Sequence, residues 1–88
     1  MNKEELVTFD GIKRYIDLSF SSIENNDNNL MKFCQKIDIA EHNTTYHILN
    51  GAFSVNERKE LFNYRIKQLY KVIEKEILSQ MDAVNDEI

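Results

Sequence analysis

The sequence has no proline and only two glycines, Gly11 and Gly51. Proline removes a backbone donor and breaks helices, and glycine permits the backbone angles of tight turns. A chain with so little of both has few obligatory breaks. The scarcity therefore favours a helical protein with short connections.

Cysteine is almost absent as well, because Cys34 is the only one in 88 residues. A single thiol excludes an internal disulfide and a zinc site built from several cysteines, and it fits a reducing compartment. No run approaches the roughly 18 apolar residues that span a bilayer, and the first five residues lack the features of a secretory signal. We therefore expect a soluble, cytoplasmic protein without a membrane partner.

The length of the chain points to another protein chain as a partner. A chain of 88 residues corresponds to a single domain, residues 1–88, which buries only about 60 to 65% of the surface of its unfolded form. Its stability is then marginal unless a disulfide, a metal or another chain adds to it. Another chain is the expected source of the three, and a two-fold homodimer is the commonest arrangement.

Charge is segregated along the chain, although the net charge is only −4. Residues 37–57 contain Asp38, Glu41 and Glu57 but no Lys or Arg. The basic residues of the segment 58–76 are Arg58, Lys59, Arg65, Lys67, Lys71 and Lys75. Any basic surface must therefore come from the C-terminal segment.

Apolar periodicity predicts two helices in the first half of the chain. The first runs from about residue 11 to 24 after an Asp10 cap, and the second from about 29 to 37. The Asn25–Asn29 cluster between them offers side chains that bond their own backbone, which predicts a loop ending in an N-cap. Cys34 falls on the apolar face, so we expect a buried thiol rather than a nucleophile. The apolar positions are Ile12, Ile16, Phe20, Ile23, Leu30, Phe33, Cys34 and Ile37.

A long C-terminal helix is the clearest element of the sequence. Residues 54–57 match a capping box, and apolar residues then recur every three or four positions from residue 55 to the low eighties. Thirty helical residues extend about 45 Å, whereas a globule of this chain length is about 31 Å across. Part of the helix should overhang and pack on a second chain; a disordered acidic tail at 82–88 is the alternative. The residues assigned to the dimer interface are Phe62, Ile66, Leu69, Ile73, Ile77 and Met81.

Residues 39–51 allow two structures. As a helix, the segment ends at Gly51 in the left-handed conformation. As a strand, it enters the Asn50–Gly51 turn of a hairpin at 44–55, which local propensity favours. We favour the helix, because a two-stranded hairpin is marginal and only Glu5–Phe9 could supply a third strand. The expected fold is an all-α bundle of about four helices, and an α+β fold with the hairpin is the alternative.

On the helical interpretation, the segment from Lys32 to Gly51 resembles the helix-turn-helix of Cro and repressor proteins. Cys34 would be the small residue of its first helix, and Asp38 would take the turn position. The pattern departs from the family at Asp38, where Gly is usual, and at Thr44, where Val or Ile is usual. The resemblance implies base and phosphate contacts from His42, Asn43, Thr45 and Tyr46.

Basic charge is missing from this middle segment, although such regulators draw much of their affinity from Lys and Arg. Arg58, Lys59 and Arg65 could supply phosphate contacts if the start of the last helix lies beside the DNA groove. A solvated helix face is the simpler explanation for these three residues.

Residues for catalysis are not evident. His42 and His47 lie five positions apart, which turns them about 140° from one another on a helix, so they do not form a metal-binding pair. No Gly-rich phosphate loop, nucleophile elbow or catalytic carboxylate pair occurs at a recognisable spacing. We expect a protein that is not an enzyme and that uses no cofactor, metal or small-molecule substrate.

Two functions from different classes are consistent with these features. The first is a small dimeric DNA-binding transcriptional regulator of the kind carried by phages or mobile elements. The second is a helical protein-binding module, such as an inhibitor, antirepressor or immunity protein, which docks on a protein target through its acidic half and an exposed helical face. The absence of basic charge on the predicted reading helix motivates the second hypothesis.

Overall fold

Three helices and no strand make up the described part of the chain, residues 7–26 and 28–87, in the computed structural model. They are α1 (Phe9–Ser21), α2 (Leu30–Asn50) and α3 (Val55–Glu87). The all-α class is confirmed, whereas the count of about four helices and the alternative hairpin at 44–55 are wrong. None of the helices in these ranges is long and apolar enough to cross a membrane.

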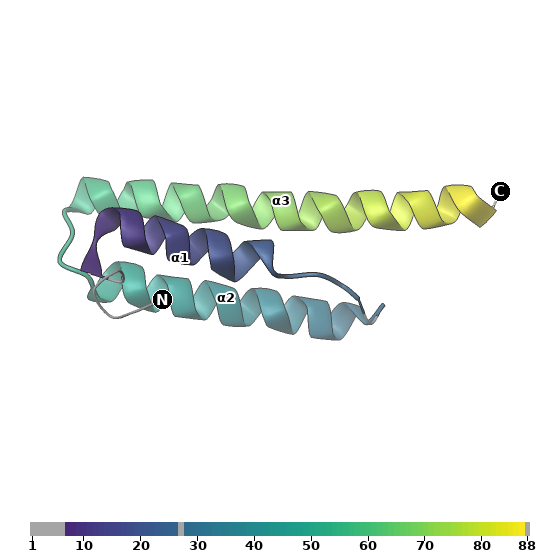
Figure 1. Cartoon of the computed structure of the whole chain (residues 1–88), viewed down its shortest axis with the longest axis horizontal. Coiled ribbons are helices and arrows are strands. Elements are labelled where there is room, and N and C mark those ends of the chain that lie inside the picture. The colour runs from purple at the N-terminus through teal and green to yellow at the C-terminus, as the bar shows by residue number, and fades with distance from the viewer. Residues whose placement is uncertain (1–6, 27, 88) are drawn as a thin grey trace.

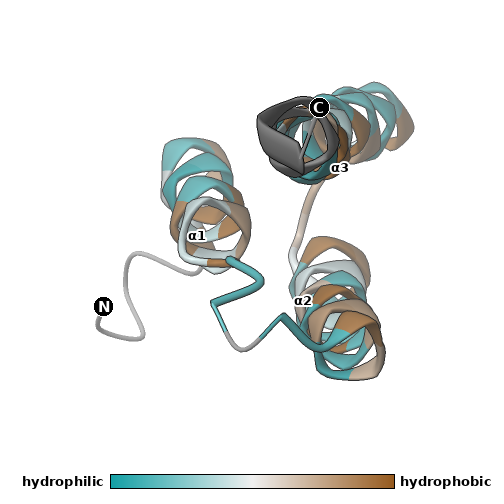
Figure 2. Cartoon of the chain, turned by 90° about the vertical axis from the view of Figure 1, so that its right-hand side faces the viewer, coloured by the Kyte–Doolittle hydropathy of each residue, from teal (hydrophilic) through white to brown (hydrophobic). Residues whose placement is uncertain are grey.

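The three helices pack around one core. Helices α1 and α3 run in the same direction and α2 runs back against them (Figure 1), and a view along the bundle places the three at the corners of a triangle (Figure 2). Each helix contributes one apolar face, as the periodicity predicts. The buried residues are Ile12, Ile16, Phe20, Ile23, Phe33, Ala40, Ile48, Leu61 and Val72.

Helix α2 is one continuous helix, so the turn predicted at Asp38 does not form. No proline or glycine interrupts the segment, and Asp38 is exposed on the outside of the helix, where a polar side chain costs nothing. Ala40 and Thr44 continue the buried face, and the Thr44 hydroxyl donates to the Ala40 carbonyl at 2.7 Å. The two short helices expected on either side of Asp38 are therefore a single helix of 21 residues.

Cys34 is exposed rather than buried. The buried face of α2 is centred on Phe33, Ala40, Thr44 and Ile48, which recur every four or seven positions. Cys34 follows Phe33 by one position, or about 100° around the helix, which carries its thiol out of the core.

Side-chain caps fix the starts of all three helices. Thr8 rather than Asp10 caps α1, because its hydroxyl accepts from the Gly11 amide at 2.9 Å, and the helix begins two residues earlier than predicted. Asn29 caps α2 as the loop prediction requires, accepting from the Lys32 amide at 3.1 Å.

The predicted capping box at the start of α3 is confirmed. The Glu57 amide donates to the Ser54 hydroxyl at 3.1 Å, and the Ser54 amide donates to the Glu57 carboxylate at 2.9 Å. Two backbone amides that the helix itself leaves unpaired are thereby satisfied.

Gly51 does not adopt the left-handed conformation predicted for it. Its φ of −75° and ψ of 157° are extended, and its amide donates to the His47 carbonyl at 3.2 Å. A glycine is required here for space, because a Cβ at this position would collide with the ring of Phe53.

Helix α3 extends well past the other two (Figure 1), as its length predicts. The described chain measures 53 × 22 × 17 Å, and its radius of gyration of 15.2 Å exceeds the roughly 12 Å of a compact chain of this size. The backbone of α3 is helical to Glu87. The alternative prediction, a disordered acidic tail at 82–88, depends on side chains that lie outside the described part of the chain.

Candidate interaction surface

The residues predicted to read DNA do not share one exposed surface. His42, Asn43 and Tyr46 are exposed on α2. Thr45 instead lies half-buried against α3, where its hydroxyl accepts a hydrogen bond from Arg65. Because α2 has no turn at Asp38, these side chains belong to the middle of a long helix rather than to a separate reading helix.

Arg65 joins α3 to α2. Its Nη1 donates to the Glu41 carbonyl at 3.1 Å and to the Thr45 hydroxyl. Its guanidinium also lies over the ring of Phe62, 5.0 Å from the centroid, in a cation–π arrangement. The guanidinium of Arg65 is therefore occupied by contacts within the chain, whereas the DNA hypothesis assigned it a phosphate contact.

Arg58 holds the connection between α2 and α3. Its Nη2 donates to the Gly51 carbonyl at 2.8 Å and to the Leu49 carbonyl at 3.4 Å. Both acceptors belong to the end of α2 or the residue after it, where helical carbonyls lack partners. Of the three predicted phosphate contacts, Lys59 is the one that is exposed without such a contact to α2.

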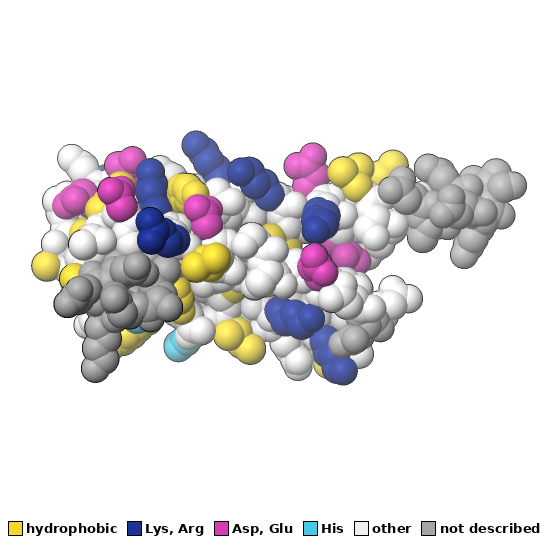
Figure 3. All heavy atoms as spheres, viewed as in Figure 1, with side chains coloured by type: hydrophobic (Ala, Val, Ile, Leu, Met, Phe, Trp, Pro, Cys, Tyr) yellow, Lys and Arg dark blue, Asp and Glu magenta, His cyan; other side chains and the backbone are white. Residues whose placement is uncertain are grey.

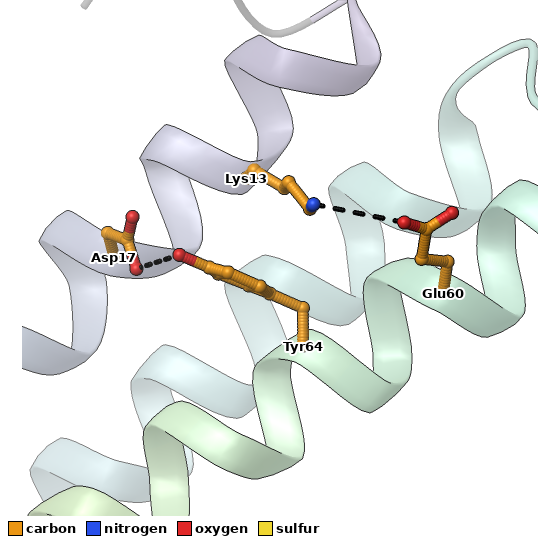
Figure 4. Close-up of polar contacts among 4 residues, drawn as sticks. All are labelled: Lys13, Asp17, Glu60 and Tyr64. Carbon is orange, nitrogen blue, oxygen red and sulfur yellow. Dashed lines mark hydrogen bonds and ion pairs between the residues drawn. The ribbon is translucent and has the colours of Figure 1, made fainter.

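Polar contacts between α1 and α3 flank the core (Figure 4). The Tyr64 hydroxyl donates to Asp17 Oδ1 at 2.5 Å, and Lys13 Nζ lies 3.8 Å from Glu60 Oε1. The hydrogen bond to Asp17, then burial and the charge of that carboxylate, raise the pKa of Tyr64 to about 12. Local spacing does not signal these contacts, because they depend on the register between two helices.

An apolar stripe runs along α3 beside its core residues, and most of its members are exposed. We define the α3 stripe as Phe62, Ile66, Tyr70, Ile73, Ile77 and Met81. Ile66, Tyr70, Ile77 and Met81 are 43, 68, 52 and 55% exposed, respectively. The core face of the same helix is buried at Leu61 and Val72.

The predicted dimer interface corresponds to the α3 stripe in five of its six residues. Ile66, Ile77 and Met81 are exposed and Ile73 is half-buried, whereas Phe62 and Leu69 are partly buried and pack against the core. Tyr70 is the most exposed member of the stripe.

A basic ridge accompanies the stripe on the outer side of α3. Lys67, Lys71 and Lys75 are exposed and recur every four residues, which places them on one side of the helix. Acidic side chains are interspersed among the basic ones along α3 (Figure 3), and Lys75 Nζ lies 3.7 Å from Glu24 Oε1. The ridge is therefore partly neutralised at its far end.

Hollows also lie between the helices, and two of them are relevant to the surface. One of about 300 Å³ lies between α1 and α2 and includes Ile39 and Asn43, and one of about 230 Å³ lies beside the loop before α2 and includes Asn25 and Glu76. The Asn25 amide donates to the Glu76 carboxylate at 2.9 Å in the second hollow. Among the described residues, no three His, Cys, Asp or Glu side chains come together as a metal would require.

Comparison with known proteins gives no family assignment for this chain. No protein-family model matches the chain, and neither the curated proteins nor the solved structures include a significant match to it.

Proposed function

We propose that this protein is a helical protein-interaction module that binds a second copy of itself through the α3 stripe. The observation that carries the proposal is the exposure of Ile66, Tyr70, Ile77 and Met81 on a helix whose other face already fills the core. A monomeric domain gains nothing from a continuous apolar line on its outside, whereas exposed apolar patches mark interaction sites.

The energetics favour covering the stripe. Full burial of a large aliphatic side chain contributes about 1.5–3 kcal/mol. Ile66, Ile77 and Met81 are about half exposed, so covering them adds roughly half of that amount for each. A second copy presents the same stripe, and a two-fold pair uses it on both sides of the interface.

Measurement of mass in solution tests this proposal, and neighbouring residues of α3 provide a matched pair of variants. Ile77 and Leu78 are both 52% exposed, but they point about 100° apart around the helix. Sedimentation or light scattering should give a dimer for the wild type and for Leu78→Asp, and a helical monomer for Ile77→Asp. A wild-type monomer at high concentration, or equal loss of the dimer in both variants, would refute the proposal.

Duplex DNA is the second candidate partner, and the basic ridge is the observation that favours it. Lys67, Lys71 and Lys75 could neutralise phosphates along a groove, in a dimer that presents two ridges. Recognition would then depend on α3 for charge and on the exposed His42, Asn43 and Tyr46 of α2 for base contacts.

A mobility-shift assay separates this candidate from the first. Binding to DNA should weaken steeply as salt rises, and Lys71→Gln with Lys75→Gln should weaken all duplexes alike. Asn43→Ala should relax sequence preference instead. If no duplex is retarded at low salt, DNA binding is excluded while the self-associating module stands.

A further inference from the structure

We infer that the two copies pair antiparallel through α3, about a two-fold axis that passes between Lys71 and Val72. This inference rests on the proposed function and names the geometry of that pairing. The α3 stripe supports it because the steps between its residues are four, four, three, four and four, which is the same sequence of steps from either end. Reversal of one helix therefore superimposes the stripe on itself.

The reversed register matches apolar side chains in pairs. The facing pairs are Phe62 with Met81, Ile66 with Ile77, and Tyr70 with Ile73. Each pair occurs twice in the dimer, once on either side of the two-fold axis, as a two-fold interface requires. The four exposed residues of the stripe thus contact apolar partners, two of which are the half-buried Phe62 and Ile73.

Charge placement also agrees with the antiparallel pairing. Lys67 follows Ile66 by one position and Glu74 follows Ile73 by one position, so both lie on the same flank of the α3 stripe. In an antiparallel two-fold pair, each flank of one helix meets the same flank of the other helix. The register then brings Lys67 to within about 3 Å, measured along the helix axis, of Glu74 from the second copy. In a parallel pair, opposite flanks meet, and Lys67 would face the flank that carries the apolar Leu69 instead.

The overhang of α3 explains why a second copy is the fitting occupant. The loop before α2 reaches Ser79 of α3 at the second hollow, and α3 continues to Glu87. In the antiparallel pair, Met81 of one copy lies on Phe62 of the other, beside that copy's three-helix body. The stretch of α3 around Met81, which is 55% exposed, is thereby supported by the body of the second copy.

Cysteine cross-linking in the full chain tests the direction of pairing. Replacement of the single native thiol by Cys34→Ser allows one new cysteine at a time, Ile66→Cys or Ile77→Cys. Antiparallel pairing separates identical positions by 11 residues, or about 16 Å along the helix, which is too far for a disulfide. The two variants, one carrying a size tag, should therefore cross-link only when mixed, with Leu78→Cys as the exposed control that cross-links with neither.

The outcomes distinguish this inference from the proposed function. A mixed disulfide between the Ile66→Cys and Ile77→Cys chains, without disulfides in either alone, supports antiparallel pairing. If each variant instead cross-links to itself, the dimer is parallel, and the inference fails while the proposed function stands. A dimer that forms no disulfide in any combination uses another surface, which overturns both.

Discussion

The hydrogen bond between Tyr64 and Asp17 makes folding stability depend on pH in the alkaline range. The pKa of Tyr64 is about 12 in the folded chain, above the ordinary 10.0 expected when the chain is unfolded. Above pH 10 the unfolded state therefore loses the phenolic proton while the folded state keeps it. The stabilisation is complete below pH 10 and is lost as pH rises from 10 to about 12.

We predict that Tyr64→Phe removes this part of the pH dependence. Urea denaturation of the wild type should lose stability between pH 10 and 12 more steeply than the variant does. At neutral pH the variant should be about 1.5–3 kcal/mol less stable, the usual contribution of a hydrogen bond to a charged group. Tyr46→Phe, which changes a 57% exposed phenol outside the α3 stripe, serves as the control and should follow the wild type. Equal pH profiles for the wild type and Tyr64→Phe would contradict the assignment.

Gly51 is required by the close approach of Phe53, and its replacement should be costly. A Cβ would meet the ring carbons of Phe53, which is partly buried and packs against the core. We predict that Gly51→Ala lowers the free energy of unfolding by about 1–3 kcal/mol, as overpacking usually does. In the background of Phe53→Ala the same substitution should cost much less, and a double-mutant cycle by urea denaturation measures the difference. Additive effects of the two changes would show that the ring is not the obstacle.

Residue types alone did not reveal what the arginines do. A basic residue near a helix start is compatible with a phosphate contact or with a solvated surface, and the sequence contains no sign of a third role. Arg58 and Arg65 contact carbonyls and a hydroxyl of α2, and these contacts depend on the path of the chain between the two helices. The burial of Thr44, by contrast, follows from its position on the apolar face.

At the scale of helices, local rules predicted most of the structure. The capping box, the Asn29 cap and the length of α3 are set by neighbouring residues, and all three are confirmed. The predicted turn at Asp38 depended on a family pattern rather than on a break in helical character. Since the chain has neither proline nor glycine there, α2 continues through it.

The capping box should be needed for the stability of α3. We predict that Ser54→Ala costs about 1 kcal/mol, because the Glu57 amide loses its side-chain acceptor. Glu57→Gln keeps an acceptor for the Ser54 amide and should cost less than Glu57→Ala. Midpoints of urea unfolding followed by circular dichroism compare these variants. A Ser54→Ala midpoint equal to that of the wild type would show that water replaces the cap without cost.

The elongated shape of the whole molecule follows from a comparison of two lengths. A helix as long as α3 cannot fit within a globule of 88 residues, and this much is evident from apolar periodicity. The way in which the helices pack is not evident from the periodicity, since each of the three apolar faces could pack against either of the others. In the structure, α3 contacts α1 through Tyr64 and α2 through Arg65.

Stability of the whole molecule should depend on its concentration if two copies pair through α3. Binding between folded chains stabilises them by mass action, and a tenfold rise in concentration contributes about 1.4 kcal/mol for each mole of dimer. We predict that the thermal midpoint of the wild type and of Leu78→Asp rises with protein concentration, whereas that of Ile77→Asp stays constant. Calorimetry over a hundredfold range measures this. A constant midpoint for the wild type would contradict pairing in this concentration range.

The two ends of the three-helix body are held to different degrees. At one end, Arg58 ties α3 to the end of α2 across a connection of four residues, 51–54, and the capping box closes the start of α3. At the other, α3 passes a hollow and continues alone. In a single copy, transient opening should therefore begin at the far end and travel toward Ser54, with amide hydrogens near Leu61 exchanging with solvent last. Unfolding would then proceed in one direction along the bundle, and the connection between α2 and α3 would be the last part to unfold.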